Sequence, residues 1–545
     1  MVGQRHGLAS VLVIDDAGMM TGPQCGIYAG LPRFTARQQL LRDLGTLKLL
    51  RGSEPHAMVV PRCSRSGDVV ETRVCPQWFV DCTSMAQRAV EAVESGSLQI
   101  HPSRYVSTWQ QWLGNIRPWC VSRQLWWGHR IPAYYATVTA NDSGSGGEEW
   151  VVARNEADAL QAASLALGVP PNRITLRQDE DVLDTWFSSG LFPFAAFGWP
   201  EKTEDLHRFF PGHLLETGHD ILFFWVARMV MLSLELTDRL PFKQICLHAM
   251  IRDARGRKMS KSLGNVIDPA DIIQGSSLDA LQTRVKSSAL APSEIEAALQ
   301  ANALDFPKGI PPCGTDALRF ALCAYTAQGR DINLSVDRVV GYSAFCNKIW
   351  NATKFVTSHL LEAEEQDTPL EGNLLSHAAS GIDSWILSRL CSTCDAVHAG
   401  FCSYNMSQVT SAIYNFLWHD FCDVYLECAK TRLNSPGAQN LEDRRQERLV
   451  IRSVLLRCVT DATLLLNPLM PYLSEELYHR LKAVPFAAHG TGVGKASACI
   501  ASFPTGLGLR DELLEDDVAD ALKLAQAVRS CFILRCIPSS AVSCT

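Results

Sequence analysis

The sequence lacks any apolar run that is long and uninterrupted enough to cross a membrane. Its best candidate, residues 221–236, contains Arg228 and Glu235, whereas a spanning helix needs about 20 predominantly apolar residues. We therefore interpret this run as a buried helix and expect no membrane association.

An excess of positive charge is also lacking. The chain has 50 Lys and Arg against 57 Asp and Glu, which gives a net charge of −7. This balance argues against a protein that binds nucleic acid over its whole surface. Any contact with RNA must come from local basic patches, because attraction to phosphates is screened over short distances.

Paired cysteines at zinc-site spacing are nearly missing, although the chain has 19 cysteines. Most are scattered singly in apolar stretches, as Cys323 is, which is typical of reduced and buried thiols in an intracellular protein. Cys391 and Cys394 could form half of a metal site or a redox pair. Because no second pair accompanies them and their flanks are helical, we prefer two buried thiols and expect no metal site.

The length of 545 residues is too great for one hydrophobic core. A hydrophobic content of 47% and a charged content of 20% fit an ordinary folded protein. Local patterns predict a strand at 11–14, a helix at 36–50 and another over 512–528, and Asp268 and Pro269 should begin a further helix. We expect five segments: a mixed one at 1–75, an α/β one at 76–275, helical ones at 276–340 and 341–485, and a tail at 486–545.

One segment concentrates positive charge. Between Arg252 and Lys261, five basic residues face a single acid, Asp253, and Gly256 lies among them. Lys258 and Lys261 are three residues apart, so a turn can direct both ammonium groups to one side. Such a segment could hold a triphosphate. On charge alone, a solvated surface loop explains it better.

The exact residue sequence of this segment favours triphosphate binding over a solvated surface loop. Lys258-Met259-Ser260-Lys261-Ser262, followed by Leu-Gly-Asn, resembles the second signature of the class I aminoacyl-tRNA synthetases. The resemblance implies that these five residues bind ATP, which is used with Mg²⁺. It also implies that Lys258 and Lys261 are catalytic and stabilise the leaving pyrophosphate, and that the two serines help to position the loop.

Three further segments are similar to the valyl branch of that family: residues 119–132, 179–189 and 216–225. Isoleucyl and leucyl relatives usually carry other letters there, and these specificities are the weaker alternatives. The resemblance implies a valine–tRNA ligase that activates valine with ATP and transfers it to tRNA(Val). It also implies editing of mischarged tRNA in the intact family.

The same segments supply candidate residues for the amino acid. Trp186 could form an apolar wall for a small branched side chain, or it could be an ordinary core aromatic residue. Asp220 matches the carboxylate that binds the α-ammonium group, although it could also cap a helix that starts at Ile221. Ile221 and Glu216 are the other candidates for substrate binding, and Glu216 and His219 could either contact the substrate or support the residues that do.

The histidine signature that class I synthetases carry near their first catalytic strand, His-Ile-Gly-His or close to it, does not occur in the sequence. The resemblance implies that residues 1–75 are the remnant of an editing domain and that the chain begins inside a longer enzyme. Its C-terminus also departs from the family pattern. A catalytically impaired tRNA-binding fragment or a splice variant is therefore the alternative function.

The expected fold class is α/β plus all-α. It comprises a partial editing domain, the second half of a Rossmann-like catalytic domain with a stem-contact region, and an α-helical anticodon-binding bundle. We further expect a monomer. We place it in the mitochondrial matrix, with the cytoplasm as the alternative.

Overall fold

The computed structural model describes residues 2–9, 11–63, 66–138, 147–259, 265–288, 290, 292–326, 331–364, 367–370, 374, 380–434, 441–488, 494–506, 508 and 510–535. The chain forms two compact units, which are described separately. The first comprises Met1–Thr83 and Arg117–Ser188, and the second comprises Ser84–Ile116 and Ser189–Thr545.

The first 75 residues contain little regular structure. Their elements are α1 (Val2–Arg5), the 3₁₀ turn η1 (Pro23–Tyr28) and α2 (Arg33–Thr46). The helix predicted at 36–50 is therefore present but starts and ends earlier. The strand predicted at 11–14 was wrong, because only an isolated bridge from Ile14 to Met20 forms there. Val11 and Leu12 are 54% and 46% exposed, so no neighbouring strand buries the side chains that favoured this strand.

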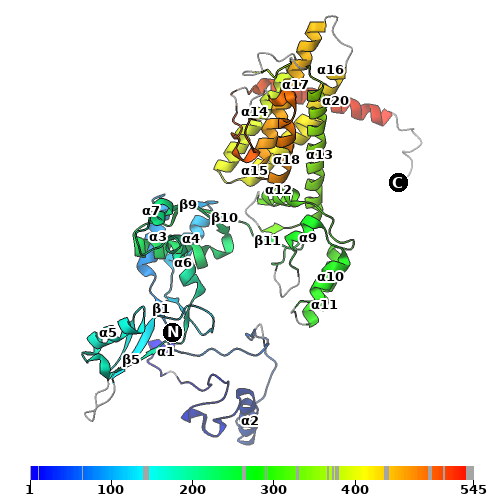
Figure 1. Cartoon of the computed structure of the whole chain (residues 1–545). Helices are drawn as coiled ribbons and strands as arrows, with labels where there is room; N and C mark the ends of the chain where they lie inside the picture. Colours follow the sequence, from blue (N-terminus) through cyan, green and yellow to red (C-terminus); the bar gives the residue numbers. More distant parts are fainter. Residues whose placement is uncertain are drawn as a thin grey trace. The chain divides into compact units, whose positions relative to one another are not determined.

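An antiparallel sheet with one covering helix forms the regular part of the first unit. Its strands lie in the order β6-β5-β7, with β5 at Ala133–Val138, β6 at Glu148–Val152 and β7 at Ile174–Gln178. Helix α5 (Glu156–Leu167) packs on this sheet (Figure 1). Asn155 accepts a hydrogen bond from the Asp158 N–H at 2.9 Å and caps α5, and Gly168 ends it with φ of 66°. The 3₁₀ turn η2 (Pro171–Arg173) leads into β7.

Four short strands complete the first unit. β1 (Phe79–Val80) pairs with β3 (Trp119–Cys120), and β4 (Ser122–Arg123) pairs with β8 (Val182–Leu183), both antiparallel. The pairing of β4 with β8 joins the segment at 119–132 to the segment at 179–189. Two regions that the sequence analysis treated separately are therefore one structural element.

A parallel sheet is the centre of the α/β part of the second unit. Its order is β2-β10-β9, with β2 at Gln99–His101, β9 at Gly212–Gly218 and β10 at Phe242–His248. Parallel strands need crossover connections, which helices usually supply. Helix α3 (Thr83–Glu94) precedes β2. The helices between the strands are α4 (Tyr105–Gly114), α7 (Glu204–Phe209), α8 (Ala227–Thr237) and α6 (Thr185–Ala195), whose first four residues belong to the first unit.

The apolar run at 221–236 is buried over most of its length, as predicted, although Phe224 and Leu236 are 47% and 42% exposed. It consists of a 3₁₀ turn η3 (His219–Ile221), a π-helical turn η4 (Leu222–Val226) and α8. Leu222 and Val226 are buried, as are all eight residues from Ala227 to Leu234. Across the described helices of the chain, none has the length and apolar character that a membrane crossing requires.

A short parallel pair, β11 (Ile251–Arg252) with β12 (Ile332–Asn333), and three helices follow the sheet. The helices are α9 (Pro269–Gln274), α10 (Leu278–Lys286) and α11 (Pro292–Asp305). The predicted start of α9 is confirmed, because Asp268 accepts a hydrogen bond from the Ala270 N–H at 2.9 Å and Pro269 is the first helical residue. Ile272, Leu281 and Ile310 belong to a core shared with α12 (Thr315–Tyr325).

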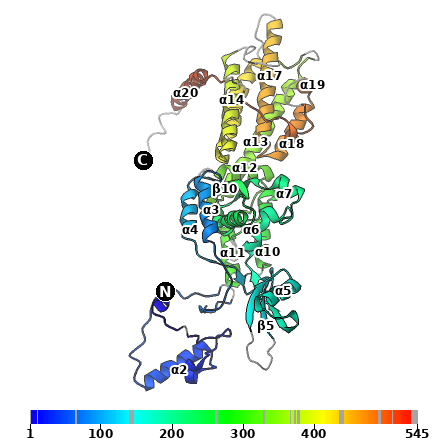
Figure 2. The same ribbon diagram turned by 90° about the vertical axis from the view of Figure 1, so that its left-hand side faces the viewer.

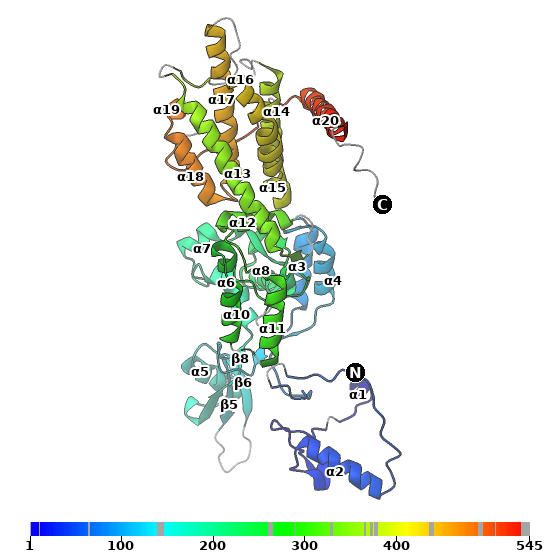
Figure 3. The same ribbon diagram turned by 90° about the vertical axis from the view of Figure 1, so that its right-hand side faces the viewer.

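The remainder of the second unit is a helical bundle, as the apolar periodicity predicted. In Figure 2 α14 lies beside α17, and in Figure 3 α13 runs along α17 and α18. The predicted helix over 512–528 corresponds to α20, whose buried Glu515 accepts a hydrogen bond from Ser388 Oγ at 2.5 Å. The elements are α13 (Val336–Leu361), α14 (Gly381–Cys402), α15 (Met406–Asn415), the π-helical η8 (Phe416–Tyr425), α16 (Leu426–Asn434), α17 (Leu441–Leu466), α18 (Pro471–Lys482), α19 (Pro485–Ala488), the 3₁₀ turn η9 (Ala498–Ile500) and α20 (Glu512–Arg535).

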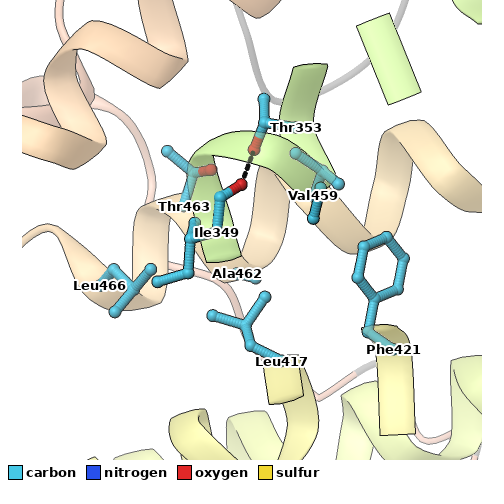
Figure 4. A pocket seen from close by; sticks show the side chains of 9 residues that line it. Ile349, Thr353, Leu417, Phe421, Val459, Ala462, Thr463 and Leu466 are labelled. Carbon is cyan, nitrogen blue, oxygen red and sulfur yellow. Dashed lines mark hydrogen bonds between the residues drawn. The ribbon is translucent and has the colours of Figure 1, made fainter. Parts of the chain in front are cut away.

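The bundle core contains one small cavity of about 10 Å³ (Figure 4). Ile349, Leu417 and Phe421 line it, and the hydroxyl of Thr353 donates to the Ile349 carbonyl at 3.0 Å. A space of this size holds at most about one water molecule, and its walls are almost wholly apolar. We regard it as a packing defect and not as a binding site.

Cys391 and Cys394 are buried in α14. Burial, with a smaller contribution from Asp461, raises the pKa of Cys394 to about 12. Its thiol therefore stays protonated at neutral pH, whereas metal binding and redox exchange use the thiolate.

Candidate active site

The basic segment forms a tight hairpin after β11. The Asp253 N–H donates to the Arg257 carbonyl at 3.0 Å, and the Gly256 N–H donates to the Asp253 carbonyl at 2.9 Å. An antiparallel bridge then joins Arg252 to Lys258. Gly256 has φ of 77°, a left-handed conformation that a glycine adopts without strain. The hairpin ends at Lys258 and so fixes the start of the predicted phosphate loop.

Asp253 is the buried centre of this hairpin, with 4% of its surface exposed. One of its carboxylate oxygens accepts the N–H groups of Arg255 and Arg257 at 3.0 and 2.8 Å. The other accepts Arg257 Nε at 2.7 Å and Asn265 Nδ2 at 3.0 Å. Burial acts to raise the pKa of Asp253, but the hydrogen bonds from Asn265 and Arg257 outweigh it and lower the pKa to about 2. The carboxylate therefore remains charged and organises the turn.

Each arginine of the basic segment is paired with a carboxylate. Arg257 pairs with Asp253 at 2.7 Å, Arg255 pairs with Asp305 of α11 at 2.7 Å, and Arg252 pairs with Asp331. The fold thus brings two further carboxylates to the arginines.

Lys258 is exposed and, within the described part of the chain, has no ion-pair partner. Met259 follows it and is half-buried. The predicted residues Ser260, Lys261 and Ser262 lie outside the described residues. The geometry therefore leaves Lys258 as the cation that this hairpin offers to a ligand.

A second group of candidate residues lies at the carboxyl ends of β9 and β10. Because the two strands are parallel and in register, Glu216 lies opposite Cys246, and Gly218 lies opposite His248. His248 Nε2 approaches the Glu216 carboxylate at 3.4 Å, and its Nδ1 donates to the Ala249 carbonyl at 2.9 Å. Burial, together with the charge of Glu216, raises the pKa of Cys246. In open α/β sheets this edge is where ligands bind.

Asp220 lies in the 3₁₀ turn η3 directly after β9 and is exposed. The alternative role as a helix N-cap was wrong, because Gly218 occupies the cap position and Asp220 is already inside the turn. Its Oδ1 would lie 3.0 Å from a β-carbon at position 218, so the absence of a side chain on Gly218 makes room for this carboxylate. Ile221 is half-buried and precedes the π-helical turn η4, a feature that is frequent at functional sites.

Trp186 is half-buried near the start of α6 and belongs to the first unit. The backbone N–H of Trp186 donates to the carboxylate of the buried Asp184 at 3.4 Å. Asp184 also accepts Trp119 Nε1 at 3.0 Å and Arg123 Nη2 at 2.8 Å. Glu216, Asp220, Ile221 and the hairpin belong to the second unit, and each group is described within its own unit.

The sequence analysis named Asp253 only as the single acid of the basic segment, and it missed Asp305 and Asp331 as partners of the arginines. The spacing of Asp253 and Gly256 is typical of a turn and could have identified Asp253. Nothing in the sequence connects Asp331 to Arg252, which lies 79 positions earlier, or Asp305 to Arg255.

A groove on the second unit is a further candidate surface. It has a volume of about 410 Å³ and lies between α12, α13 and α15. Arg338, Tyr342, Tyr414 and Asn415 line it, and its lining contains no Asp or Glu. Arg338 is exposed, and its guanidinium lies 4.5 Å from the centre of the Tyr325 ring. The groove therefore offers hydrogen-bond donors and aromatic rings without negative charge.

Comparison with known families places the chain in one of them. Residues 60–335 match the family described as tRNA synthetases class I (I, L, M and V), and residues 383–535 match the anticodon-binding domain of tRNA ligases. The chain belongs to the class I tRNA synthetases. The hairpin and the parallel sheet of this synthetase chain lie within the first match, and residues 383–535 of the bundle form the second, whereas α13 lies between the two.

Curated relatives of this synthetase chain are valine–tRNA ligases. The Rattus norvegicus protein is 49% identical over 97% of this chain and 41% of its own length, and the Caenorhabditis elegans protein is 51% identical over 88% and 45%. A mitochondrial valine–tRNA ligase of Mus musculus is 46% identical over 97% and 48%. The chain thus spans less than half the length of the relatives that it matches. The predicted resemblance to the valyl branch is confirmed.

The predicted fold class is also confirmed. A methionyl-tRNA synthetase from Mycobacterium tuberculosis, solved with methionyl-adenylate, aligns over 82% of this chain and 71% of its own, with a TM-score of 0.53 and 18% identity. At this identity the likeness shows the fold alone. The fold consists of the class I catalytic architecture followed by a helical anticodon-binding domain.

Proposed function

We propose that this synthetase chain carries the valine and ATP functions of a valine–tRNA ligase and passes valine to tRNA(Val). The observation that carries the proposal is the hairpin organised by Asp253, which presents Lys258 at the start of the signature loop. Fixed positive charge beside a phosphate is effective catalytically, because it needs no reorganisation during the reaction. The identity of 49% to a valine–tRNA ligase supports valine as the amino acid.

The proposed chemistry has two steps. A carboxylate oxygen of valine attacks the α-phosphorus of ATP, the bond to the β-phosphate oxygen breaks, and pyrophosphate leaves. A ribose hydroxyl at the end of tRNA then attacks the valyl carbonyl carbon, and AMP leaves. In the first step, we propose that Lys258 and Lys261 stabilise the charge that develops on pyrophosphate, with Met259, Ser260 and Ser262 shaping the loop.

The remaining candidate residues are assigned to valine. We propose that Asp220 binds the α-ammonium group, because it is an exposed carboxylate at the carboxyl edge of a parallel sheet. Trp186 and Ile221 would contact the apolar side chain, and Glu216 would act with its neighbour His248. Editing of mischarged tRNA belongs to the same proposal, since the intact family performs it.

Mg²⁺ fits this proposal as a companion of ATP. Among the described residues no group of three or more His, Cys, Asp or Glu is arranged to hold a metal ion, and the hairpin carboxylates are each paired with an arginine. Mg²⁺ commonly binds through substrate phosphates and water. It would neutralise phosphate oxygens, while Lys258 contributes the protein charge.

Exchange of labelled pyrophosphate into ATP tests the synthetic function. We expect valine-dependent exchange, with Lys258→Ala and Lys261→Ala each lowering it about a hundredfold or more. Lys286→Ala is the matched control, because Lys286 is an exposed lysine at the end of α10. Exchange that prefers isoleucine or leucine would reassign the specificity. A complete lack of exchange with retained tRNA binding would favour the alternative, a catalytically impaired tRNA-binding fragment.

For tRNA, we propose that the groove between α12, α13 and α15 contacts the ribose–phosphate backbone. Its arginine, hydroxyl groups and amide suit phosphate and ribose oxygens, and no lining carboxylate repels them. Filter binding of tRNA(Val) tests this: Arg338→Ala should reduce the salt dependence of the binding constant by about one phosphate contact. Lys523→Ala on the exposed part of α20 should leave it unchanged.

The compartment, oligomeric state and domain division remain proposals. We propose a monomer in the mitochondrial matrix, with the cytoplasm as the alternative. A relative labelled mitochondrial matches at 46% identity and one without that label at 49%. Cell fractionation and size-exclusion chromatography with light scattering test these two points. Limited proteolysis tests the boundaries near residues 75, 275, 340 and 485, including the assignment of 1–75 to an editing domain.

A further inference from the structure

Asp331 connects two segments that are distant in the sequence. Its Oδ1 contacts His219 Nε2 at 3.2 Å, and its Oδ2 accepts a hydrogen bond from Arg252 Nε. The Asp331 side chain is 24% exposed, and those of His219 and Arg252 are 28% and 33% exposed. The three groups are thus partly shielded from water, and one carboxylate holds both a histidine and an arginine.

The two segments carry different candidate ligands. His219 directly precedes Asp220, which we assign to the ammonium group of valine. Arg252 is the residue from which the phosphate hairpin starts, and it forms the closing bridge with Lys258. Arg252 Nη1 also reaches the Gly256 carbonyl at 3.5 Å. The Asp331 carboxylate therefore lies between the valine segment and the phosphate hairpin.

Backbone pairing keeps Asp331 in this position. Ile332 donates its N–H to the Met250 carbonyl at 2.8 Å, and Leu334 donates its N–H to the Arg252 carbonyl at 3.0 Å. These bonds belong to the parallel pairing of β11 with β12. The residue after Asp331 is therefore attached to the strand that begins the hairpin.

His219 is also held on its ring face. Tyr105, the first residue of α4, stacks on the imidazole with ring centres 5.7 Å apart and an angle of 18° between the planes. A ring fixed on one face by stacking and at one edge by a carboxylate has little freedom to rotate. A movement of Asp331 must then be transmitted to η3.

We propose that Asp331 is a positioning residue that couples the valine segment (residues 219–222) to the phosphate hairpin (residues 251–258). This inference rests on the proposed function for the identity of the two ligands, but not for the coupling itself. Burial acts to raise the pKa of Asp331, and the hydrogen bonds from His219 and Arg252 outweigh it and lower the pKa. The charged carboxylate that both contacts require is thus the form present at neutral pH.

Hydrogen exchange of the ligand-free full chain tests the coupling. Asp331→Asn keeps the shape but removes the charge, and we expect exchange about tenfold faster in both segments, as for the loss of a charge-assisted hydrogen bond. Asp305→Asn is the matched control, because Asp305 pairs with Arg255 of the same hairpin but has no contact with His219 among its described interactions. It should speed exchange in the hairpin only.

Two results would overturn the coupling. One is an Asp331→Asn protein in which both segments exchange within twofold of the wild-type rate. The other is a change confined to one segment, which would make Asp331 a local support. If Asp331→Asn does not fold, Arg252→Lys provides the second variant, since it keeps the charge and loses the planar contact with Asp331. It should loosen both segments as well.

A second measurement uses valine itself. In the wild-type chain, saturating valine should slow exchange in the hairpin, although valine binds at the other segment. In Asp331→Asn this remote protection should be lost even when valine is raised until it saturates the variant, whereas in Asp305→Asn it should persist. Protection that survives Asp331→Asn contradicts the coupling. Absence of valine binding to the wild-type chain in calorimetry contradicts the proposed function and leaves the ligand-free experiment to decide the coupling.

Discussion

Two buried aspartates of the second unit both accept hydrogen bonds from several groups, but the sequence separation between each aspartate and its partners differs. Asp253 in the hairpin is 4% exposed and binds groups that lie within 12 positions of it in the sequence. Asp383 in the bundle is fully buried and accepts hydrogen bonds from Tyr425 Oη at 2.9 Å and Arg432 Nη1 at 2.8 Å. These partners lie 42 and 49 positions away, on η8 and α16.

The difference separates local shape from global stability. Asp253 satisfies the N–H groups of its own turn, so its loss should open a hairpin while the bundle stays folded. Asp383 connects α14 to two other helical segments, and both burial and the neighbouring Asp383 raise the pKa of Tyr425. Its loss leaves the buried Tyr425 hydroxyl without its acceptor, and it leaves the half-buried Arg432 with Glu447 as its remaining ion-pair partner. We therefore expect substitution of Asp253 to impair function before folding, and substitution of Asp383 to impair folding before function.

The largest effect is expected for Asp383→Ala. The Tyr425 hydroxyl stays buried without its acceptor, which costs about 1–3 kcal/mol, and the lost ion pair with Arg432 adds to this cost. Urea unfolding followed by far-ultraviolet circular dichroism should show this loss.

Asp423→Ala is the control for Asp383→Ala. Asp423 is 47% exposed and pairs with Lys348 at 2.7 Å, and an exposed pair contributes about 0–1 kcal/mol. Equal losses in the two variants would show that burial does not distinguish these carboxylates, and the comparison would fail.

Asp253→Asn should affect nucleotide binding more than folding. The amide that replaces one oxygen presents a donor to Arg257 and Asn265, which are donors themselves, so the hairpin loses its centre. We expect ATP affinity to fall on the order of tenfold, or about 1.4 kcal/mol, with a smaller change in the unfolding midpoint than for Asp383→Ala. Calorimetric titration with ATP measures the first, and urea unfolding measures the second. The reverse order of effects would refute the assignment of Asp253 to the hairpin alone.

The contribution of Asp253 to stability should depend on pH with a defined sign. Its folded pKa is lowered from 3.8 to about 2, so the carboxylate stabilises the folded state fully above its unfolded pKa. That stabilisation is lost as the pH falls through the window from about 4 to 2. The difference in unfolding free energy between wild type and Asp253→Asn should therefore be constant from pH 5 to 7. Its size should be roughly 1.4 kcal/mol or more, which is the free energy of about one pKa unit, and it should shrink below pH 4. A difference that grows in acid would show the opposite linkage.

The smallest effect is expected for Gly218→Ala. The new β-carbon would lie 2.7 Å from Met250 Sδ and 3.0 Å from Asp220 Oδ1. Both atoms lie near the ends of flexible side chains, so the fold should tolerate the change while Asp220 is displaced. We expect valine affinity to fall by about three- to tenfold, or roughly 0.6–1.4 kcal/mol, with little change in melting temperature. Gly341→Ala, where the added carbon meets nothing within 4 Å, should leave valine affinity unchanged.

Much of the architecture was predictable from local patterns. Asp268 and Pro269 predicted the start of α9, and the apolar periodicity after residue 340 predicted the bundle. These signals succeed because caps and amphipathic faces depend on neighbours within a few positions. The predicted strand at 11–14 failed for the converse reason, since a strand requires a distant partner that these residues do not have.

The sequence by itself determined the family, through the signature letters at Lys258–Ser262 and the three valyl-type segments. It also indicated Asp220 as a candidate ligand, but as a possible helix cap rather than as part of η3. Only the tertiary structure decided which basic residues of the hairpin are paired. It brings Asp305 and Asp331 to Arg255 and Arg252 across 50 and 79 positions, so the charges of these arginines are balanced while Lys258 stays available to a ligand. Such pairings depend on how β11, β12 and α11 pack together, and contacts set by long-range packing leave no periodic signal in the chain.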